Sequence, residues 1–351
     1  MTLSVLSIAY PFAPVGPHAV GGSEQILSHL DRELVATGNT SLVIACEGSE
    51  TQGRLFPSPL PKDSELNEAN QRAFQCRFQA VINQVLSAHS VDLVHMHGLD
   101  FWAYTISSNV PVLVTLHLPI TWYPSDIAKR CPSNRHLQSV SETQRATFPP
   151  ELRDSQVIPN GVEIPPFPDT TKSNFAIAMG RICPEKNLHA ALEAGTLAQT
   201  TVLLAGQVFP YEAHQQYFCE KVVPLLGKHR FLGPVVPPRK EQLLAQAKCL
   251  LHPTLAPETS SLVAMEAMAA GTPVIAFRSG ALTEIVEDGV TGFLVNSIEE
   301  MAQAIRKVDA ISPRVCWEAA NRRFSKERMV QQYFRLYRNL LATDAREQRC
   351  A

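Results

Sequence analysis

The amino-acid sequence predicts an α/β protein made of two doubly wound, parallel-sheet domains. Short apolar runs alternate with helical patterns along the whole chain, as expected where crossover helices join parallel strands. A length of 351 residues exceeds one typical domain and suits two, each large enough to bury its own core. The proline-rich segment at 164–169 can continue neither a helix nor a central strand, so we take it as the linker.

The predicted strands are short runs rich in β-branched and other apolar residues. In the first half they lie at 5–9, 41–45, 92–96, 112–116, 137–140 and 156–158. In the second half they lie at 175–179, 201–205, 230–232, 249–252, 274–277 and 292–295. We therefore expect an N-terminal domain at 1–164, a linker at 165–170 and a C-terminal domain at 171–325.

Three helices are predicted from apolar periodicity and from capping residues. One follows Gly21-Gly22-Ser23-Glu24 and runs to about Thr37, where Gly38 ends it. The second covers a sheet from about 64 to 89, with its apolar face formed by Phe74, Phe78, Val81, Ile82, Val85 and Leu86. The third occupies 326–341 at the C-terminus, and the charged remainder to 351 is expected to fray.

Composition narrows the possible partners and the compartment. A formal charge of −2, from 31 basic and 33 acidic residues, lacks the basic bias that nucleic-acid binding needs. The eight cysteines are scattered without C-x-x-C spacing, so we expect reduced thiols and no zinc or redox site. The sequence lacks a leader pattern and a membrane-spanning apolar run, which predicts a cytoplasmic protein. Peripheral contact with the inner membrane face stays open.

The segment at 257–276 is the most informative part of the chain, because it sets two carboxylates around a predicted helix start. Pro257 disfavours helix before it and Gly271 is a natural stop, so Glu258 lies in a loop and Glu266 within a short helix. Unpaired N–H groups and the hydroxyls of Thr259, Ser260 and Ser261 would form an anion site that suits a phosphate. The alternative is a capped surface helix with solvated acids.

The E-x7-E pattern of Glu258 and Glu266, followed by an alanine-rich helix and Gly-Thr-Pro-Val-Ile-Ala at 271–276, resembles the signature of retaining glycosyltransferases of family 4. The segments at 175–187 and 279–295 resemble the flanking parts of that family in the same order. The resemblance implies a GT-B fold, with two Rossmann-like domains facing across a cleft and a terminal helix at 326–351 that crosses back to the first domain. One departure is Asn187, where many relatives carry glycine.

The resemblance also implies roles for individual residues. Arg181 and Lys186 would neutralise the donor diphosphate, Glu258 would bind donor-sugar hydroxyls and assist the anomeric centre, and Glu266 would bind the ribose. The implied catalytic residues are Glu258, His117, Arg181 and Lys186. The implied substrate-binding residues are Gly21, Gly22, Arg181, Lys186, Glu258, Thr259, Ser260, Ser261, Leu262 and Glu266.

Residues of the N-terminal half follow two predicted strands. Glycines after the first strand permit close backbone approach and positive φ, which suit a phosphate or a sugar ring, although a plain loop is the alternative. His117 ends a buried strand at the edge where open α/β sheets bind ligands, and it resembles a donor-sugar contact. His97 ranks below it, since a neutral histidine satisfied by backbone groups is equally expected there. Asn160-Gly161 matches a family turn near the hinge. The segment at 118–130, with Trp122 and Tyr123, either lines the acceptor side or is an ordinary packed loop.

Taken together, these features predict a retaining glycosyltransferase. It would move a hexosyl-type group from a nucleoside-diphosphate sugar to a hydroxyl of a glycan, a lipid-linked or a small-molecule acceptor. The resemblance also implies that the leaving phosphate takes the acceptor proton. The chain lacks a D-x-D motif, so we expect no metal and no cofactor.

Four other classes of protein are alternatives to this prediction. A GT-B sugar-nucleotide epimerase and a non-catalytic sugar-nucleotide-binding protein remain alternatives. A hydrolase is disfavoured, because eight residues on a helix rotate the two carboxylates by about 80° and neither has a partner that would raise its pKa. A dehydrogenase is also disfavoured, because it would need the motif G-x-G-x-x-G after the first strand and this sequence lacks it.

Overall fold

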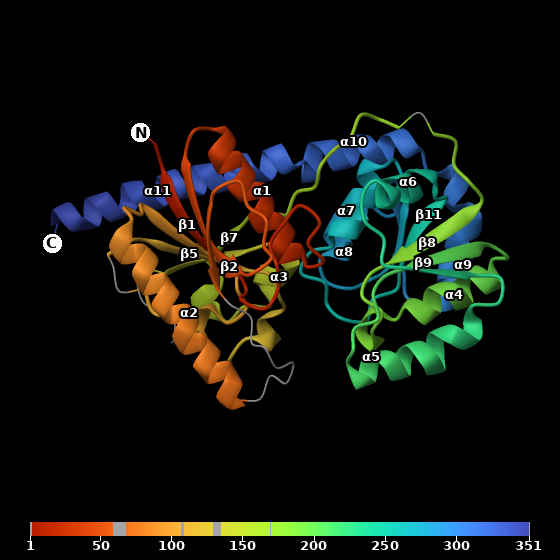
Figure 1. Ribbon diagram of the computed structural model, residues 1–351. Coiled ribbons are helices and arrows are strands. Elements are labelled where there is room, and N and C mark those ends of the chain that lie inside the picture. Colours follow the sequence, from red (N-terminus) through yellow and green to blue (C-terminus); the bar gives the residue numbers. More distant parts are fainter. Residues whose placement is uncertain (1, 59–67, 107–108, 129–134, 169, 351) are drawn as a thin grey trace. The chain divides into compact units, whose positions relative to one another are not determined.

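The computed structural model describes residues 2–58, 68–106, 109–128, 135–168 and 170–350. The chain divides into two compact units (Figure 1). Unit 1 contains Met1–Pro159 and Met329–Ala351, and unit 2 contains Asn160–Arg328. The segment predicted as a linker, 165–170, falls within unit 2, and its residue 169 lies outside the described residues. No helix in the described part of the chain combines the length and apolar character that a membrane span requires.

Unit 1 is built on a seven-stranded parallel sheet with strand order β3-β2-β1-β4-β5-β6-β7. The order reverses between β1 and β4, which is the doubly wound arrangement that places ligands at the carboxyl ends of the strands. The strands are β1 (Ser4–Ile8), β2 (Thr40–Cys46), β3 (Arg54–Ser58), β4 (Leu93–Met96), β5 (Val112–Leu116), β6 (Arg135–Ser139) and β7 (Gln156–Val157). All of them except β3 were predicted from the sequence. This strand includes Pro57, which fits its place at the edge of the sheet.

The helices of unit 1 bury the apolar faces that periodicity predicted. They are α1 (Gly22–Ala36), α2 (Glu68–Ala88) and α3 (Glu142–Ala146), with short 3₁₀ helices at Phe101–Ala103, Ile120–Trp122 and Pro150–Leu152. On α2, Phe74, Phe78, Ile82 and Val85 are buried against the sheet, which confirms that this helix belongs to the core. Residues 64–67 of the predicted helix lie outside the described residues.

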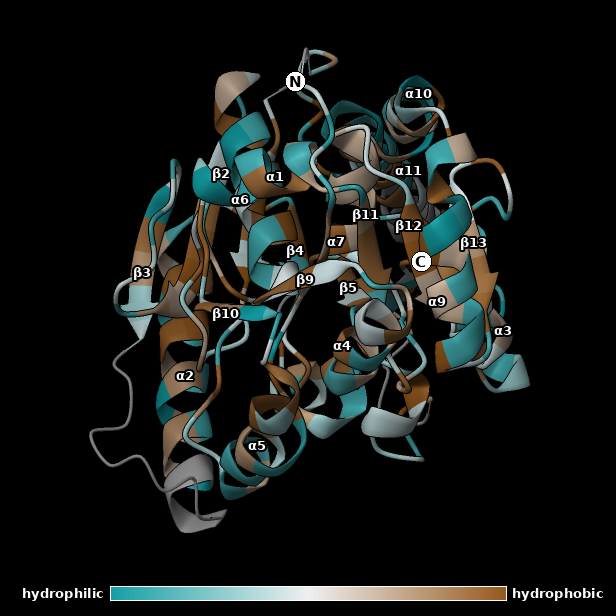
Figure 2. Ribbon diagram, turned by 90° about the vertical axis from the view of Figure 1, so that its right-hand side faces the viewer, coloured by the Kyte–Doolittle hydropathy of each residue, from teal (hydrophilic) through white to brown (hydrophobic). Residues whose placement is uncertain are grey.

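Unit 2 repeats the same architecture with a six-stranded parallel sheet in the order β10-β9-β8-β11-β12-β13. Its strands are β8 (Phe175–Met179), β9 (Thr201–Ala205), β10 (Arg230–Gly233), β11 (Cys249–His252), β12 (Val274–Phe277) and β13 (Gly292–Val295). All six were predicted from the sequence. The brown colour of β11, β12 and β13 in Figure 2 marks them as strands of a buried parallel sheet.

The helices of unit 2 cover both faces of this sheet. They are α4 (Leu188–Leu197), α5 (Glu212–Tyr217), α6 (Arg239–Gln246), α7 (Leu262–Ala269), α8 (Leu282–Ile285), α9 (Ile298–Lys307) and α10 (Pro313–Phe324). A π-helical segment at Phe218–Val222 and 3₁₀ helices at Pro184–Lys186, Val223–Leu225 and Val308–Ala310 complete the unit.

The last helix, α11 (Lys326–Cys350), starts in unit 2 and belongs to unit 1 from Met329 onward. The hydroxyl of Tyr333 donates a hydrogen bond to Oε1 of Gln138 at 2.8 Å, and the hydroxyl of Tyr337 lies 2.8 Å from Nδ1 of His95. Both tyrosines are fully buried. The helix continues to Cys350, beyond Leu341, where the predicted apolar stripe ends. The last residues include alanine, arginine, glutamate and glutamine, which are good helix formers.

Candidate functional site

The turn that follows β8 presents two cations and ends in an unusual backbone conformation. Arg181 is exposed, and Lys186 closes the 3₁₀ helix at Pro184–Lys186. Asn187 then adopts a left-handed conformation with φ of 54°, and its side-chain Nδ2 donates to the carbonyl of Pro253 at 3.1 Å. Glycine enters this region freely and asparagine is among the few other residues that do. Asn187 therefore fits this left-handed conformation and adds a side-chain hydrogen bond to it.

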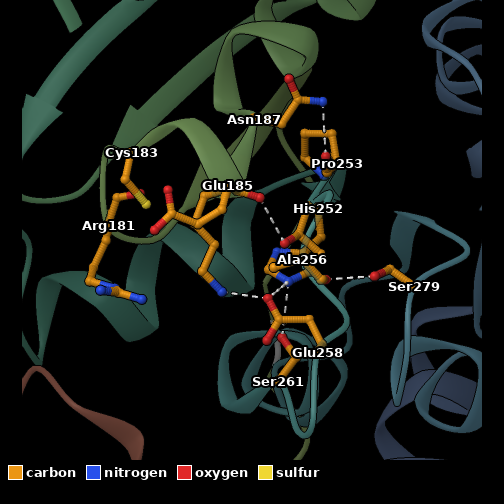
Figure 3. Close-up of polar contacts among 12 residues, drawn as sticks. Arg181, Cys183, Glu185, Asn187, His252, Pro253, Ala256, Glu258, Ser261 and Ser279 are labelled. Carbon is orange, nitrogen blue, oxygen red and sulfur yellow. Dashed lines mark hydrogen bonds and ion pairs between the residues drawn. The ribbon is translucent and has the colours of Figure 1, made fainter. Parts of the chain in front are cut away.

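The loop that carries Glu258 is held by hydrogen bonds on two sides (Figure 3). On one side, Leu255 N and Thr254 Oγ1 both donate to the carbonyl of Glu185, at 2.9 Å and 3.2 Å. On the other side, Ser279 Oγ donates to the carbonyl of Ala256 at 2.6 Å, and Ala281 N donates to the carbonyl of Glu258 at 2.7 Å. The backbone at 254–258 is thus fixed relative to both the Lys186 turn and the loop after β12.

Gly280 allows this second loop to press against Glu258. Its φ is +50°, a conformation that glycine adopts without strain. A Cβ atom at this position would lie 2.7 Å from the backbone nitrogen of Glu258 and closer still to its carbonyl oxygen. Only glycine fits between the two loops.

The carboxylate of Glu258 is paired and ionised. It forms an ion pair with Lys186, and Nε2 of His252 lies 3.5 Å from the same oxygen. The exposed fractions of the Lys186 and Glu258 side chains are 19% and 11%. Burial raises the pKa of Glu258, but the hydrogen bond from His252 and the charge of Lys186 outweigh it and lower that pKa to about 2. Glu258 is therefore an anion at neutral pH and cannot act as a general acid.

Glu266 lies on α7 in a different environment. Its Oε1 forms an ion pair with Nζ of Lys240 at 2.6 Å, while Oε2 is buried with no hydrogen-bond partner in the described part of the chain. Burial raises the pKa of Glu266, and the charge of Lys240 only partly offsets it. From the sequence, neither carboxylate was expected to have a partner that would raise its pKa. The cause at Glu266 is burial, which the spacing of the two residues did not reveal.

The start of α7 differs from the prediction in its capping. Ser261 occupies the N-cap position, but its side chain makes no capping bond and instead lies 3.3 Å from Nε2 of His252. The N-cap thus lies within 259–261, where N-cap hydroxyls were expected, but the Ser261 hydroxyl contacts His252 instead of a helix N–H group. Oγ of Ser260 is buried without a hydrogen-bond partner among the described residues, and Thr259 is also buried. The N–H groups of Leu262 and the next residues have no partner within the helix, as at any helix start.

The glycine pair of unit 1 begins α1, and its first member packs against a buried carboxylate. Gly21 is the N-cap of α1, with φ of −82°, and Gly22 is the first residue of that helix. Neither residue has a positive φ, so that part of the prediction is wrong. A Cβ atom on Gly21 would collide with the carboxylate of Glu24, a buried group. Burial raises the pKa of Glu24. Glycine at position 21 therefore makes room for this carboxylate.

Histidines gather at the carboxyl ends of β4 and β5 in unit 1. Nε2 of His117 lies 3.2 Å from Nδ1 of His97, and the ring of His95 lies 3.9 Å from that of His97. Burial lowers the pKa of His117 to about 4, so it is neutral at pH 7. Nε2 of His97 is buried without a partner among the described residues. Backbone groups of these residues therefore do not satisfy this nitrogen, contrary to the alternative considered for His97. His97 belongs with His117 at this edge.

The segment at 118–130 and the turn at Asn160 are the two other features predicted for the N-terminal half. Tyr123 is buried, and its hydroxyl accepts a hydrogen bond from Leu118 N at 3.3 Å, as in a packed loop. Trp122 is 52% exposed and so remains a candidate contact for a ligand. Lys129 and Arg130 lie outside the described residues. Asn160 is buried, at the start of unit 2.

The structure thus brings together Lys186, Glu258 and the start of α7, with Glu266 and Lys240 on neighbouring helices of unit 2. Lys240 was missed by the sequence analysis, because a lysine on a surface helix carries no motif. Gly21, Gly22 and His117 belong to unit 1.

Two family models match adjacent parts of the chain. Residues 20–164 match the model for Glycosyltransferase Family 4, and residues 174–309 match that for Glycosyl transferases group 1. Each unit, with its doubly wound sheet, therefore corresponds to one half of a two-domain glycosyltransferase. The chain belongs to the family-4-like glycosyltransferases and has the GT-B fold.

The likeness to solved structures covers nearly the whole chain. The sucrose-phosphate synthase of Thermosynechococcus elongatus has a TM-score of 0.80 and 20% sequence identity, covering 97% of this chain and 100% of that one. The Anabaena protein HepE in complex with UDP and glucose has a TM-score of 0.74 and 20% identity, covering 95% and 99%. At this identity the likeness defines the fold alone.

Curated relatives match shorter stretches or at lower identity. A probable sucrose-phosphate synthase of Thermosipho melanesiensis is 28% identical over 207 residues, which are 53% of this chain and 48% of that protein. The chain thus spans about half the length of that relative. The phosphatidyl-myo-inositol mannosyltransferase of Mycobacterium leprae is 23% identical over 296 residues, covering 73% of this chain and 76% of that protein.

Proposed function

We propose that this protein is a retaining glycosyltransferase that moves a hexosyl-type group from a nucleoside-diphosphate sugar to a hydroxyl acceptor. The observation that carries the proposal is the ion pair between Lys186 and Glu258 beside the start of α7. This arrangement sets a cation, an anion and free helix N–H groups next to one another in unit 2. Such a set suits a ligand with a negative phosphate end and a sugar end that becomes positive during the reaction.

The donor diphosphate would be bound by Arg181, Lys186, the N–H groups at 260–262 and the hydroxyls of Thr259 and Ser260. The buried Ser260 Oγ without a partner supports this role, since a phosphate oxygen would satisfy it. Glu266 would bind the ribose, because its buried Oε2 has an unused acceptor site for a ribose hydroxyl. Lys240 would hold the other oxygen of that carboxylate in place.

Glu258 would bind donor-sugar hydroxyls and stabilise positive charge at the anomeric carbon. Its low pKa supports this electrostatic role and argues against proton donation. In the proposed reaction, the bond from the anomeric carbon to the diphosphate oxygen breaks and a bond to the acceptor oxygen forms on the same face of the sugar. The acceptor proton passes to the departing diphosphate, so the reaction needs no further base.

Residues of unit 1 are proposed for contacts with donor or acceptor. His117 would contact the donor sugar as a neutral ring, consistent with its lowered pKa of about 4. The backbone at Gly21 and Gly22, at the start of α1, would approach a ligand closely. Exposed Trp122 offers an aromatic face to a sugar ring.

The reaction is proposed to need no metal, because Arg181 and Lys186 supply positive charge where other enzymes use a divalent ion. Dialysis against chelator should leave transfer activity unchanged. Loss of activity that Mg²⁺ or Mn²⁺ restores would contradict this part of the proposal.

The acceptor is proposed to be a hydroxyl of a carbohydrate, a lipid-linked or a small molecule. Relatives named as sucrose-phosphate synthase, phosphatidyl-myo-inositol mannosyltransferase and glycogen synthase support this wide class. Contact with a membrane surface would follow if the acceptor is lipid-linked. A sugar-nucleotide epimerase or a non-catalytic binding protein is the alternative function.

The first experiment is a thermal-shift screen of the purified protein with UDP-, GDP- and ADP-sugars. Binding to the folded state raises the midpoint by mass action. We expect one nucleotide class to stabilise the wild type, Lys186→Ala and Glu266→Ala to abolish this shift, and Lys248→Ala to retain it. Lys248 is the matched control because it also forms an ion pair, with the exposed Asp309 at 2.9 Å.

The positive nucleotide sugar is then incubated with and without acceptors. Sugar transfer with retained anomeric configuration supports the proposal, and an isomerised nucleotide sugar formed without acceptor would support the epimerase instead. If no sugar nucleotide shifts the wild type at millimolar concentration, the proposed function is wrong.

A further inference from the structure

Three side chains that can bind metals meet next to the turn that carries Lys186. Sγ of Cys183, a carboxylate oxygen of Glu185 and a ring nitrogen of His214 all lie within 4.8 Å of one another. Cys183 and Glu185 flank the start of the 3₁₀ helix at Pro184–Lys186, and Figure 3 shows their side chains next to each other. His214 comes from α5, far along the sequence. All three belong to unit 2.

Two residues of the cluster are buried, Glu185 is half-buried, and one ring nitrogen of His214 is unsatisfied. Cys183 is fully buried and His214 is 9% exposed. Nδ1 of His214 has no hydrogen-bond partner within the described residues, although the ring packs edge-on against Tyr211 with centroids 5.1 Å apart. A buried nitrogen left without a partner destabilises the folded state. Neither His214 nor Cys183 has a part in the proposed transfer reaction, so the unpartnered nitrogen is available to a separate ligand.

The thiol of Cys183 donates toward the carbonyl of Arg181, with an Sγ to oxygen distance of 3.6 Å. Its sulfur also lies within 4.8 Å of a carboxylate oxygen of Glu185. Replacement of the thiol proton by a bound cation would therefore leave two anionic ligand atoms close together.

The donor set of sulfur, imidazole nitrogen and carboxylate oxygen identifies the preferred ion. Zn²⁺ binds these three atom types in tetrahedral sites, whereas Ca²⁺ and Mg²⁺ prefer oxygen alone. Bond lengths of about 2.0–2.3 Å place tetrahedral ligand atoms roughly 3.3–3.8 Å apart. The three atoms here lie within 4.8 Å of one another, an upper limit about 1 Å above that spacing.

We propose that Cys183, Glu185 and His214 form a Zn²⁺ site with an open fourth position. The S–Zn bond would replace the S–H bond, and the thiol proton would leave to solvent. The bound ion would join α5 to the turn at Pro184–Lys186, and this turn carries the lysine that pairs with Glu258. The site is distinct from the transfer chemistry, which is proposed to proceed without metal.

The test uses the full chain, Zn²⁺ for affinity and Co²⁺ as a spectroscopic probe. Competition against a chromogenic chelator should give one tight Zn²⁺ site per chain. Co²⁺ should produce a thiolate-to-metal charge-transfer band in the near ultraviolet. We expect Cys183→Ser to abolish this band, and His214→Gln and Glu185→Gln each to weaken Zn²⁺ binding by roughly tenfold or more.

Cys219→Ser is the matched control. Cys219 is exposed in the π-helical segment that follows α5, so its removal should leave the band and the affinity unchanged. Zn²⁺ should also raise the thermal midpoint of the wild type and of this control, but not that of His214→Gln. Because Cys183 is buried, His214→Gln and Glu185→Gln provide the test if Cys183→Ser does not fold.

The proposal is wrong if Co²⁺ gives no charge-transfer band, or if Zn²⁺ affinity is the same in the wild type and in His214→Gln. None of these measurements uses a sugar nucleotide. Failure of the metal site would therefore leave the proposed transferase function untouched, and failure of the transferase function would leave the metal site standing.

Discussion

Nζ of Lys240 lies 2.6 Å from Oε1 of Glu266, while Oε2 of the same carboxylate is buried without a partner among the described residues. One oxygen of Glu266 is thus held and the other is available. Burial raises the pKa of Glu266 and Lys240 lowers it, so the lysine helps to keep the buried carboxylate ionised. Lys240 is accordingly a positioning residue for the ribose contact that we propose for Glu266.

The first prediction is that Lys240→Met weakens sugar-nucleotide binding. Without the ammonium group, Glu266 loses a charge-assisted hydrogen bond and its pKa rises further. A bond of this kind is worth about 1.5–3 kcal/mol, which corresponds to a loss of affinity of roughly tenfold or more. Isothermal titration calorimetry at pH 7 measures it. Lys228→Met, which removes an exposed lysine elsewhere in unit 2, should bind as the wild type does.

The second prediction concerns the stability of unit 2. In Lys186→Met, the carboxylate of Glu258 remains buried beside His252 without its cation, and breaking such a pair costs about 3 kcal/mol. Urea unfolding measures this loss. Lys248→Met breaks the pair with Asp309, whose side chain is 74% exposed, and should cost at most about 1 kcal/mol. Equal losses in the two variants would contradict the burial argument.

The third prediction is that Gly280→Ala displaces Glu258. The new Cβ atom would collide with the backbone of Glu258 in addition to the strain of a positive φ. We expect a loss of stability well above the roughly 1–2 kcal/mol of left-handed strain alone, together with loss of activity. Gly289→Ala is the matched control, since Gly289 has φ of +77° and open space around its Cβ position. Both variants are compared by thermal unfolding and nucleotide binding.

The fourth prediction is a pH dependence of stability in unit 1. Asp100 is buried, its Oδ1 has no partner in the described part of the chain, and Tyr104 donates to Oδ2 at 2.7 Å. Burial raises the pKa of Asp100 from 3.8 to about 6, against the smaller lowering effect of Tyr104. The folded state therefore holds this proton more tightly than the unfolded state. The associated stability is present below pH 3.8 and is lost as pH rises through 6.

Asp100→Asn should remove this dependence while keeping the acceptor for Tyr104. A shift of about two pKa units corresponds to roughly 3 kcal/mol. Between pH 4 and pH 7.5, the free energy of unfolding of the variant should therefore rise relative to that of the wild type by roughly this amount. Urea unfolding at the two pH values measures the difference. Exposed Asp154→Asn should track the wild type at both. A constant difference between Asp100→Asn and the wild type would contradict the raised pKa.

Much of the fold was predictable because it depends on local patterns. Strands buried on both faces appear as short apolar runs, and the helix at Glu68–Ala88 shows its buried face through Phe74, Phe78 and Ile82. Strand β3 was not predicted, because an edge strand is only partly buried and tolerates a proline such as Pro57. The prediction of Glu258 in a loop and Glu266 on a helix was correct, since proline and glycine mark the two ends of that segment.

The remaining features depend on contacts between distant residues, which local patterns do not encode. Lys240 meets Glu266 only because α6 and α7 pack together. The hydroxyl of Ser261 turns to His252 instead of capping its helix, and Gly21 gives space to Glu24 instead of adopting a positive φ. Cys183 and His214 likewise meet only when α5 folds against the turn after β8.

The division of α11 between the units has a consequence for folding during synthesis on the ribosome. The strands of unit 1 are synthesised first, but Tyr333 and Tyr337, which bond to Gln138 and His95 in its core, are synthesised last. Unit 2 is complete by Arg328, so it can fold cotranslationally while the first unit still lacks a segment. Nascent chains that stop before Met329 should therefore expose the buried edge of unit 1 to chaperones and proteases.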